Sequence, residues 1–262
     1  MSKSATHAFP LVDRYMGVRM GVNLATVEPG RLMVVESPRR LRREQSYGFV
    51  HGLWFLWLAD GRAAVSVPPG AGGAVRAILT GVRDRRAVLD PDLGERLKGP
   101  VGGALRSAGL RGIDRALRDL DFACNASLLR RHRCGACYRL TDGRLPIAKG
   151  IEYPDHCFPD GIVYGVVADG KVVSLAHAHR PGVMEGQVAD LGVPGTVPAC
   201  RRRGFAKACV SAVVEHVTRM GGDARYGCDP ANLASIATAR SVGFVPYGTQ
   251  LVLAAPAPDT EG

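Results

Sequence analysis

The stretch Thr196–Ala206, which reads TVPACRRRGFA, decides how the second half of this chain folds. It lies between a strand-like segment, residues 187–197, and a segment with helical spacing of apolar residues, 204–220. The first N–H groups of such a helix are unpaired and lie at the positive end of its dipole. A basic loop with Gly204 at this place can therefore hold a phosphate group, although many ordinary helix starts share the pattern.

The surrounding elements predict an α/β (α+β) fold with a mixed, mostly antiparallel sheet and flanking helices. Two strands, 161–168 and 172–179, are joined by the turn Asp169-Gly170, and the third strand is interrupted at Pro194-Gly195. After the helix come a strand at 225–228, a helix to about Ser241 that ends at Gly243, and a last strand at 250–254. The predicted order is β-β-β-α-β-α-β.

The first half of the chain also contains α/β patterns. A hairpin is predicted from Phe49–Leu58 and Ala63–Val67, and Ile113–Leu120 is predicted to be helical. We expect two domains, residues 1–120 and residues 121–262.

Composition limits the class of protein. Of 262 residues 46% are apolar, so a sizeable core can form, and no apolar run is long enough to cross a bilayer. With no apolar signal segment at the N-terminus, a cytoplasmic protein without a membrane partner is expected. The formal charge of +10 favours anionic ligands, but no nucleic-acid motif accompanies it, so a nucleic acid is not expected as a partner.

Two further motifs follow the basic loop, Asn232-x-x-Ser235 and Gly243-Phe244. Together with the loop they resemble the GNAT superfamily of N-acetyltransferases over about residues 160–254. The resemblance implies acetyl-CoA, or another acyl-CoA, as cosubstrate. It also implies that the N-terminal half is an added α/β half, which in some members of the superfamily is itself GNAT-like and degenerate. The residues it implies for cofactor binding are Thr196, Val197, Arg201, Arg203, Gly204, Phe205, Ala206, Lys207, Asn232 and Ser235.

Transfer of an acetyl or short acyl group to a primary amine needs a base, a stabilised oxyanion and, in some enzymes, an acid. Asp190 is the first candidate for the base, because it lies on the strand that enters the loop. His177 and His179, on one face of their strand, are the second. The position where GNAT enzymes often have an acidic tyrosine is Ala239, so Tyr226 or Ser235 is expected to substitute. Direct attack in a ternary complex is expected, and the amine acceptor is expected to be a small molecule or a protein.

Three alternatives stay open at this point. A weak zinc pattern consists of Cys134 and Cys137 with Cys157 and Cys124, but no second close pair of ligands accompanies it. The chain could acylate aminoacyl-tRNA, which its charge would suit. It could also be an acyl-CoA-binding sensor or scaffold without catalytic activity. Whether it forms a homodimer is also open.

Overall fold

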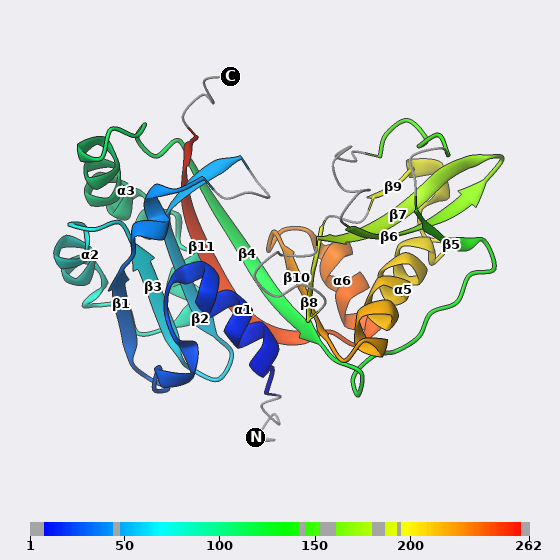
Figure 1. Ribbon diagram of the computed structural model, residues 1–262, viewed down its shortest axis with the longest axis horizontal. Coiled ribbons are helices and arrows are strands. Elements are labelled where there is room, and N and C mark those ends of the chain that lie inside the picture. Colours follow the sequence, from blue (N-terminus) through cyan, green and yellow to red (C-terminus); the bar gives the residue numbers. More distant parts are fainter. Residues whose placement is uncertain are drawn as a thin grey trace. The chain divides into compact units, whose positions relative to one another are not determined.

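The computed structural model describes residues 8–43, 48–141, 145–151, 161–179, 187–192 and 195–257, which form two compact units (Figure 1). Unit 1 comprises residues 1–8, 13–120 and 247–262, and unit 2 comprises residues 9–12 and 121–246. The chain passes from unit 1 into unit 2 after Leu120 and returns to unit 1 at Tyr247. The last residues, from Tyr247, group with unit 1, because strand β11 (Val245–Pro256) pairs antiparallel with β2 (Phe49–Leu58).

Unit 1 is a sheet with the strand order β1-β3-β2-β11-β4 and three α-helices. The predicted hairpin is confirmed as β2 and β3 (Ala63–Val67), while β1 (Leu32–Glu36) pairs parallel with β3. The helices are α1 (Pro10–Met20), α2 (Gly72–Leu79) and α3 (Pro91–Ser107), and short 3-10 helices cover Leu24–Thr26, Pro38–Leu41 and Arg85–Leu89. Apolar side chains of β2 and β3 pack against α2 and α3 to form one core.

The predicted helix at Ile113–Leu120 is wrong. Residues Arg115–Cys124 form strand β4, which lies between β11 and β10 in the strand order. Leu117 and Leu120 fit a helical period, but pairing with strands far away in the sequence outweighs this local preference.

From Gly161 to Pro256 the elements follow the predicted β-β-β-α-β-α-β order, with the third predicted strand divided into β8 and β9 and the last strand, β11, grouped with unit 1. The strand order of the sheet of unit 2 is β4-β10-β8-β7-β6-β5, and most neighbours run antiparallel, whereas β8 and β10 run parallel. The elements of unit 2 are β5 (Cys137–Leu140), β6 (Gly161–Ala168), β7 (Lys171–His179), β8 (Val188–Leu191), β9 (Gly195–Thr196), a 3-10 helix at Pro198–Cys200, α5 (Phe205–Arg219), β10 (Asp223–Cys228) and α6 (Leu233–Val242).

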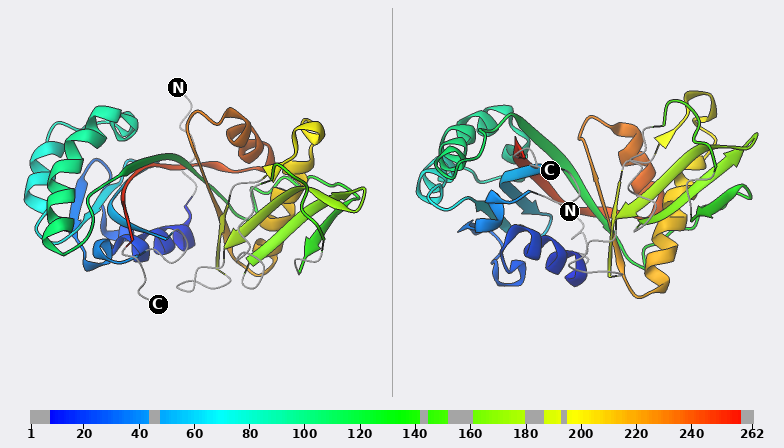
Figure 2. Two further views of the ribbon diagram at one scale, coloured as in Figure 1. Left: turned by 90° about the horizontal axis from the view of Figure 1, so that it is seen from above. Right: turned by 45° about the horizontal axis from the view of Figure 1, so that its top comes forward.

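Helices α5 and α6 contact each other and pack against the sheet of unit 2 (Figures 1 and 2). The face of α5 toward the sheet is apolar and includes Val210, Val213, Val214 and Val217, all buried. Each such side chain stabilises the fold by about 1.5–3 kcal/mol on removal from water. In the described part of the chain no helix is both long and apolar enough to cross a membrane.

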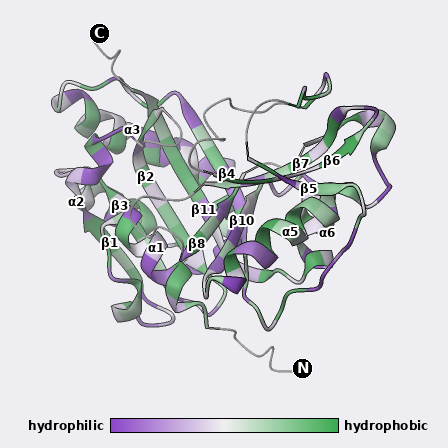
Figure 3. Ribbon diagram, turned by 45° about the vertical axis from the view of Figure 1, so that its right-hand side comes forward, coloured by the Kyte–Doolittle hydropathy of each residue, from purple (hydrophilic) through white to green (hydrophobic). Residues whose placement is uncertain are grey.

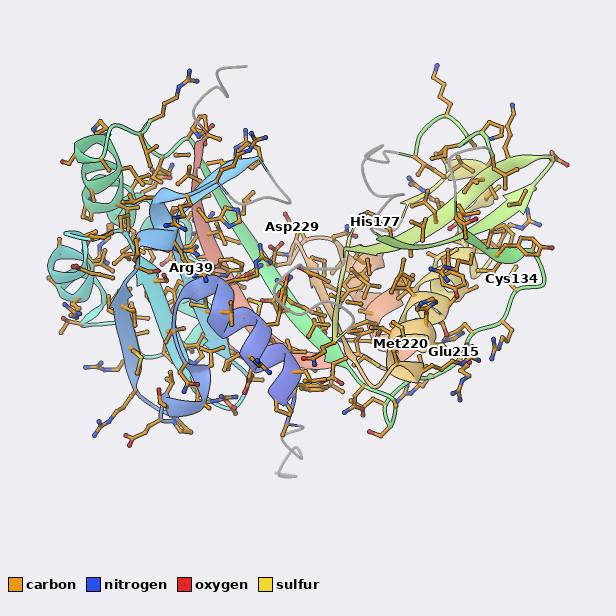
Figure 4. All side chains as sticks on the ribbon, in the orientation of Figure 1. Arg39, Cys134, His177, Glu215, Met220 and Asp229 are labelled. Atoms are coloured by element: carbon orange, nitrogen blue, oxygen red, sulfur yellow. The ribbon has the colours of Figure 1, made fainter. Side chains whose placement is uncertain are left out.

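The segment between β4 and β5 is held on α5 by charge. It is hydrophilic around its arginines (Figure 3), and Arg131 and Arg133 contact Oε1 of Glu215 at 3.0 and 3.1 Å. Arg219, one turn further along α5, contacts the same oxygen at 2.7 Å. Glu215, labelled in Figure 4, is buried, and its carboxylate forms ion pairs with three exposed arginines.

Candidate active site

Two strands separate immediately before the basic loop. Strand β8 pairs with β10 from Val188↔Asp223 to Leu191↔Tyr226. The next strand segment, β9, pairs with β7 instead, through Ser174↔Thr196. The β8–β10 pairing therefore ends where β9 begins, in agreement with the predicted interruption; Pro194 itself lies outside the described residues.

The basic loop has a backbone shape suited to an anion. Arg202 and Gly204 have positive φ, +61° and +80°, and α5 begins directly after them. Turns that alternate between right- and left-handed backbone can point successive N–H groups toward one anion. Within the described residues no side chain caps the N-terminus of α5, and a Cβ on Gly204 would meet none of their atoms within 4 Å. The first N–H groups of a helix have no partner within the helix, and here exposed arginines precede them.

Helix α2 of unit 1 provides a contrast. It also follows a glycine with positive φ, Gly70 at +86°. There the Glu36 carboxylate accepts a hydrogen bond from the N–H of Gly72 at 2.9 Å. Hydrogen bonds from the backbone N–H groups of Gly70 and Gly72 lower the pKa of Glu36. The anion position at α2 is thus occupied by the protein's own carboxylate, while the position at α5 is not capped.

The structure brings the sequence-predicted loop residues together. The Arg201 Nε donates to the Thr196 carbonyl at 3.2 Å, which ties the loop to β9. The Arg203 guanidinium lies over the Phe205 ring, 4.8 Å from its centroid. Val197 donates its N–H to the Val173 carbonyl, and Ala206 and Lys207 are partly buried in the first turn of α5.

Asn232 and Ser235 have a structural role of their own. The Asn232 side-chain oxygen accepts the Ser235 N–H at 3.0 Å and so caps α6. The amide nitrogen of Asn232 stays available as a donor at this exposed position. Gly243 ends α6 with φ +106°, and a Cβ there would lie 2.0 Å from the Leu128 carbonyl oxygen. Backbone geometry alone thus requires glycine at Gly243.

Asp190 belongs to a buried ion cluster. Its Oδ1 is 2.6 Å from Nη1 of Arg225, whose Nη2 is 2.5 Å from Oδ1 of Asp121. Asp190 and Arg225 are partners in the β8–β10 register, so both side chains lie on the same face of the sheet. The carboxylate predicted to be the base is therefore held by an arginine.

His177 lies on the same face, next to the point where β8 ends. A Cβ on Gly192 would lie 2.2 Å from Nε2 of His177, so the imidazole packs directly on the Gly192 backbone. The Gly192 N–H also donates to the His177 carbonyl. His177, labelled in Figure 4, is buried, with 5% of its surface exposed. For His179 the structure gives the backbone position, opposite Asp190 in the ladder.

Tyr226 does not lie with these candidates. It follows Arg225 in β10, so its side chain points to the opposite face of the sheet. It stacks edge-on against Phe244 with centroids 5.5 Å apart, and burial raises its pKa to about 12. A proton donor this weak is poorly matched to a thiolate leaving group.

Sequence reasoning missed four residues of this face. Asp121 and Arg225 complete the ion cluster, Gly192 makes room for His177, and a Cβ on Gly227 would lie 3.2 Å from Asp121. Glycine within strands is a signal for close approach of another group, and it was available in the sequence. The pairing of Arg225 with Asp121, 104 residues apart, was not.

Of the cysteines in the zinc alternative, Cys134 and Cys137 lie in one turn, in which the Cys137 N–H donates to the Cys134 carbonyl. Cys124 is buried in β4, and burial is the main cause that raises its pKa to about 12. Cys157 lies outside the described residues. Among the residues that are described, no group of three or more His, Cys, Asp or Glu side chains could hold a metal ion.

Residues 132–244 match the model of the acetyltransferase (GNAT) family. A putative GNAT acetyltransferase from Novosphingobium aromaticivorans is 17% identical, with a TM-score of 0.47, over 56% of this chain and 67% of that one. A GNAT acetyltransferase from Colwellia psychrerythraea is 16% identical, with a TM-score of 0.42, over 54% of this chain and 58% of that one.

An aminoglycoside N-acetyltransferase solved with CoA is 25% identical, with a TM-score of 0.29, over 32% of this chain and 68% of that one. No curated protein sequence matches the chain.

Residues 132–244 of this chain thus resemble an acetyltransferase domain of the GNAT family, and the mixed sheet of unit 2 has the arrangement expected for that fold. The match does not extend into the N-terminal half, so a GNAT-like origin of that half stays a prediction.

Proposed function

We propose that this protein transfers an acetyl or other short acyl group from acyl-CoA to a primary amine, by direct attack in a ternary complex. The observation that carries the proposal is the uncapped N-terminus of α5 behind Arg201–Gly204. Support comes from the comparable turn at α2, where the Glu36 carboxylate accepts a hydrogen bond from the first N–H group. The CoA pyrophosphate would take the corresponding position at α5, and the pantetheine arm would lie along β9 at Thr196 and Val197.

The amine must lose a proton before or during attack on the thioester carbonyl. We assign this role to His177 rather than to Asp190. Both residues lie on one face of the sheet, but the Asp190 carboxylate is engaged by Arg225 at 2.6 Å, and a base held by a guanidinium binds a proton weakly. Asp190 would then hold the cationic acceptor, or position it, through the negative charge of the cluster.

In this proposal the Tyr226 hydroxyl does not act as the general acid. The thiolate of CoA leaves without a proton donor from that side, because thiolates are stable at neutral pH compared with alkoxides. The collapsing tetrahedral intermediate returns its electron pair to the carbonyl, and the C–S bond breaks. Donors for the oxyanion would come from backbone N–H groups beside the separated strands, such as that of Gly195.

The test is release of free CoA thiol from acetyl-CoA across a library of amines, together with calorimetric titration of CoA. The paired variant Arg201→Ala/Arg203→Ala should weaken CoA binding. Arg85→Ala/Arg86→Ala, exposed arginines of unit 1, removes the same charge and should leave it unchanged. Equal CoA affinity in both paired variants would contradict the assignment of the loop.

A second candidate function is a non-catalytic acyl-CoA sensor. It is favoured by one observation, that Ala239 occupies the place of the expected acidic tyrosine and is fully buried. The two candidates differ in turnover: a sensor binds CoA at the loop, but no amine raises thiol release above background hydrolysis.

A further inference from the structure

Two thiols meet between the sheet and α5 of unit 2. Cys137 is the first residue of β5, Cys209 lies one turn into α5, and their Sγ atoms are 4.0 Å apart. Cys209 is fully buried, whereas Cys137 is partly exposed. A small reagent can therefore reach one thiol of the pair and not the other.

A row of residues that are in register across four strands connects these thiols to β9. Cys137 is opposite Val166 of β6, Val166 is opposite Ser174 of β7, and Ser174 is opposite Thr196 of β9. Residues in register share a face, so this row lies under α5. Cys209 reaches across the row, with its Sγ 3.7 Å from the Ser174 carbonyl oxygen.

The row ends at the proposed CoA site. Ser174 and Thr196 join their hydroxyl groups at 2.8 Å, and the Thr196 carbonyl accepts from Arg201. Cys209 itself is in the same helix whose N-terminus follows Gly204. A change at the thiol pair therefore acts on the loop both through Ser174 and Thr196 and through α5.

We propose that Cys137 and Cys209 are a redox-active thiol pair whose disulfide weakens acyl-CoA binding at the Arg201–Gly204 loop. A disulfide requires the two sulfurs to approach to about 2.05 Å, so the side chains of Cys137 and Cys209 must move from their present separation of 4.0 Å. In this proposal the movement breaks the contact of the Cys209 Sγ with the Ser174 carbonyl oxygen and thereby alters the β9 end of the row.

The chemistry balances with a low-molecular-weight disulfide, RSSR, as oxidant. The Cys137 thiolate attacks one sulfur of RSSR and expels one RS⁻, which leaves a mixed disulfide on Cys137. The Cys209 thiol then gives up its proton and attacks the Cys137 sulfur, and the second RS⁻ leaves. The two cysteines lose two electrons and two protons, and RSSR becomes two RSH.

The order of attack follows from the environment of each thiol. A hydrogen bond with Cys209 lowers the pKa of Cys137, which favours Cys137 as the first nucleophile. The same hydrogen bond is the main cause that raises the pKa of Cys209, followed by burial. Once Cys137 carries the mixed disulfide its negative charge is gone, so the charge repulsion that also raises the pKa of Cys209 no longer acts.

The experiment treats the full chain with oxidised glutathione, alkylates the remaining thiols and maps the peptides by mass spectrometry. A linked Cys137–Cys209 peptide, reversed by dithiothreitol, is expected in the wild type and in Cys134→Ser, the neighbouring thiol of the same turn. It should be absent from Cys137→Ser, a substitution at a partly exposed position. A Cys137 linked to Cys134 or to Cys157 instead, or only glutathionylated, would overturn the pairing.

The second measurement is the affinity for CoA, and this part of the test rests on the proposed function. Oxidation should raise the Kd for CoA by a factor within the roughly 5- to 150-fold range of site-to-site couplings, and only in variants that form the disulfide. An unchanged Kd despite the linked peptide overturns the coupling. If neither form binds CoA, the proposed function fails and the coupling with it, while the peptide map still decides whether the thiol pair forms a disulfide.

Discussion

Arg225 of β10 and Asp190 of β8 are partners in a parallel strand pair, and their Nη1 and Oδ1 atoms lie 2.6 Å apart in the interior of unit 2. Asp121 holds the other end of the same guanidinium. One arginine thus balances two carboxylates that are both almost fully buried, and it does so on the face where the acceptor amine is proposed to bind.

Removal of Arg225 should therefore be costly. Arg225→Met, which keeps the length of the side chain, leaves two buried carboxylates without their partner and should lower the free energy of unfolding by about 3–5 kcal/mol. Arg219→Ala is the control, because Arg219 makes an equally short ion pair with Glu215 but is 71% exposed. It should cost no more than about 1 kcal/mol in urea unfolding. Similar losses in both variants would contradict the buried cluster.

The conformation of Gly204 should matter for both stability and binding. Gly204→Ala puts a Cβ into open space, so its cost is that of the left-handed backbone, about 1–2 kcal/mol, together with weaker CoA binding. Gly73→Ala is the matched control: it too adds a Cβ in open space, but inside α2. Because alanine favours helix, it should be neutral or stabilising by up to about 1 kcal/mol in thermal unfolding.

Substitutions at His177 and at Gly192 should have the same effect on catalysis. His177→Gln should lower kcat by a factor of about 10²–10⁴, as expected for loss of a general base, with the Kd for CoA unchanged. Gly192→Ala forces a Cβ against the imidazole and should give the same pattern. Gly135→Ala, where a Cβ meets nothing within 4 Å, should retain wild-type turnover. Full activity of His177→Gln would show that another residue is the general base.

The Glu215 cluster predicts a pH dependence of stability. Burial raises the pKa of Glu215, but Arg131, Arg133 and Arg219 outweigh it, so the pKa lies below its ordinary value. A lowered pKa means that the charged carboxylate stabilises the fold above its unfolded pKa of about 4.3. This contribution is lost as the pH falls through the folded-state pKa.

The wild type should therefore melt above Glu215→Gln at pH 7, and the two melting temperatures should converge in acid. Glu95→Gln removes an exposed carboxylate paired with Lys98 and serves as control, with little change at pH 7. A constant difference between wild type and Glu215→Gln from neutral to acid pH would show that charge is not what holds the segment.

Much of the fold of unit 2 could be predicted from the sequence because its signals are local. The turn Asp169-Gly170, the apolar spacing of α5 and the glycine that ends α6 each act within a few residues of chain. The same is true of the loop at Arg201–Gly204, whose residue types and position between strand and helix indicate an anion site.

Only the tertiary structure decided which side chains meet. Arg225 finds Asp190 and Asp121 across separations of 35 and 104 residues, and Cys137 finds Cys209 across 72. The strand β4, with a helical period in its sequence, is a strand because it pairs with β11 and β10. Such contacts depend on register and on which strands become neighbours, and these are properties of the packed sheet that no local stretch of sequence contains.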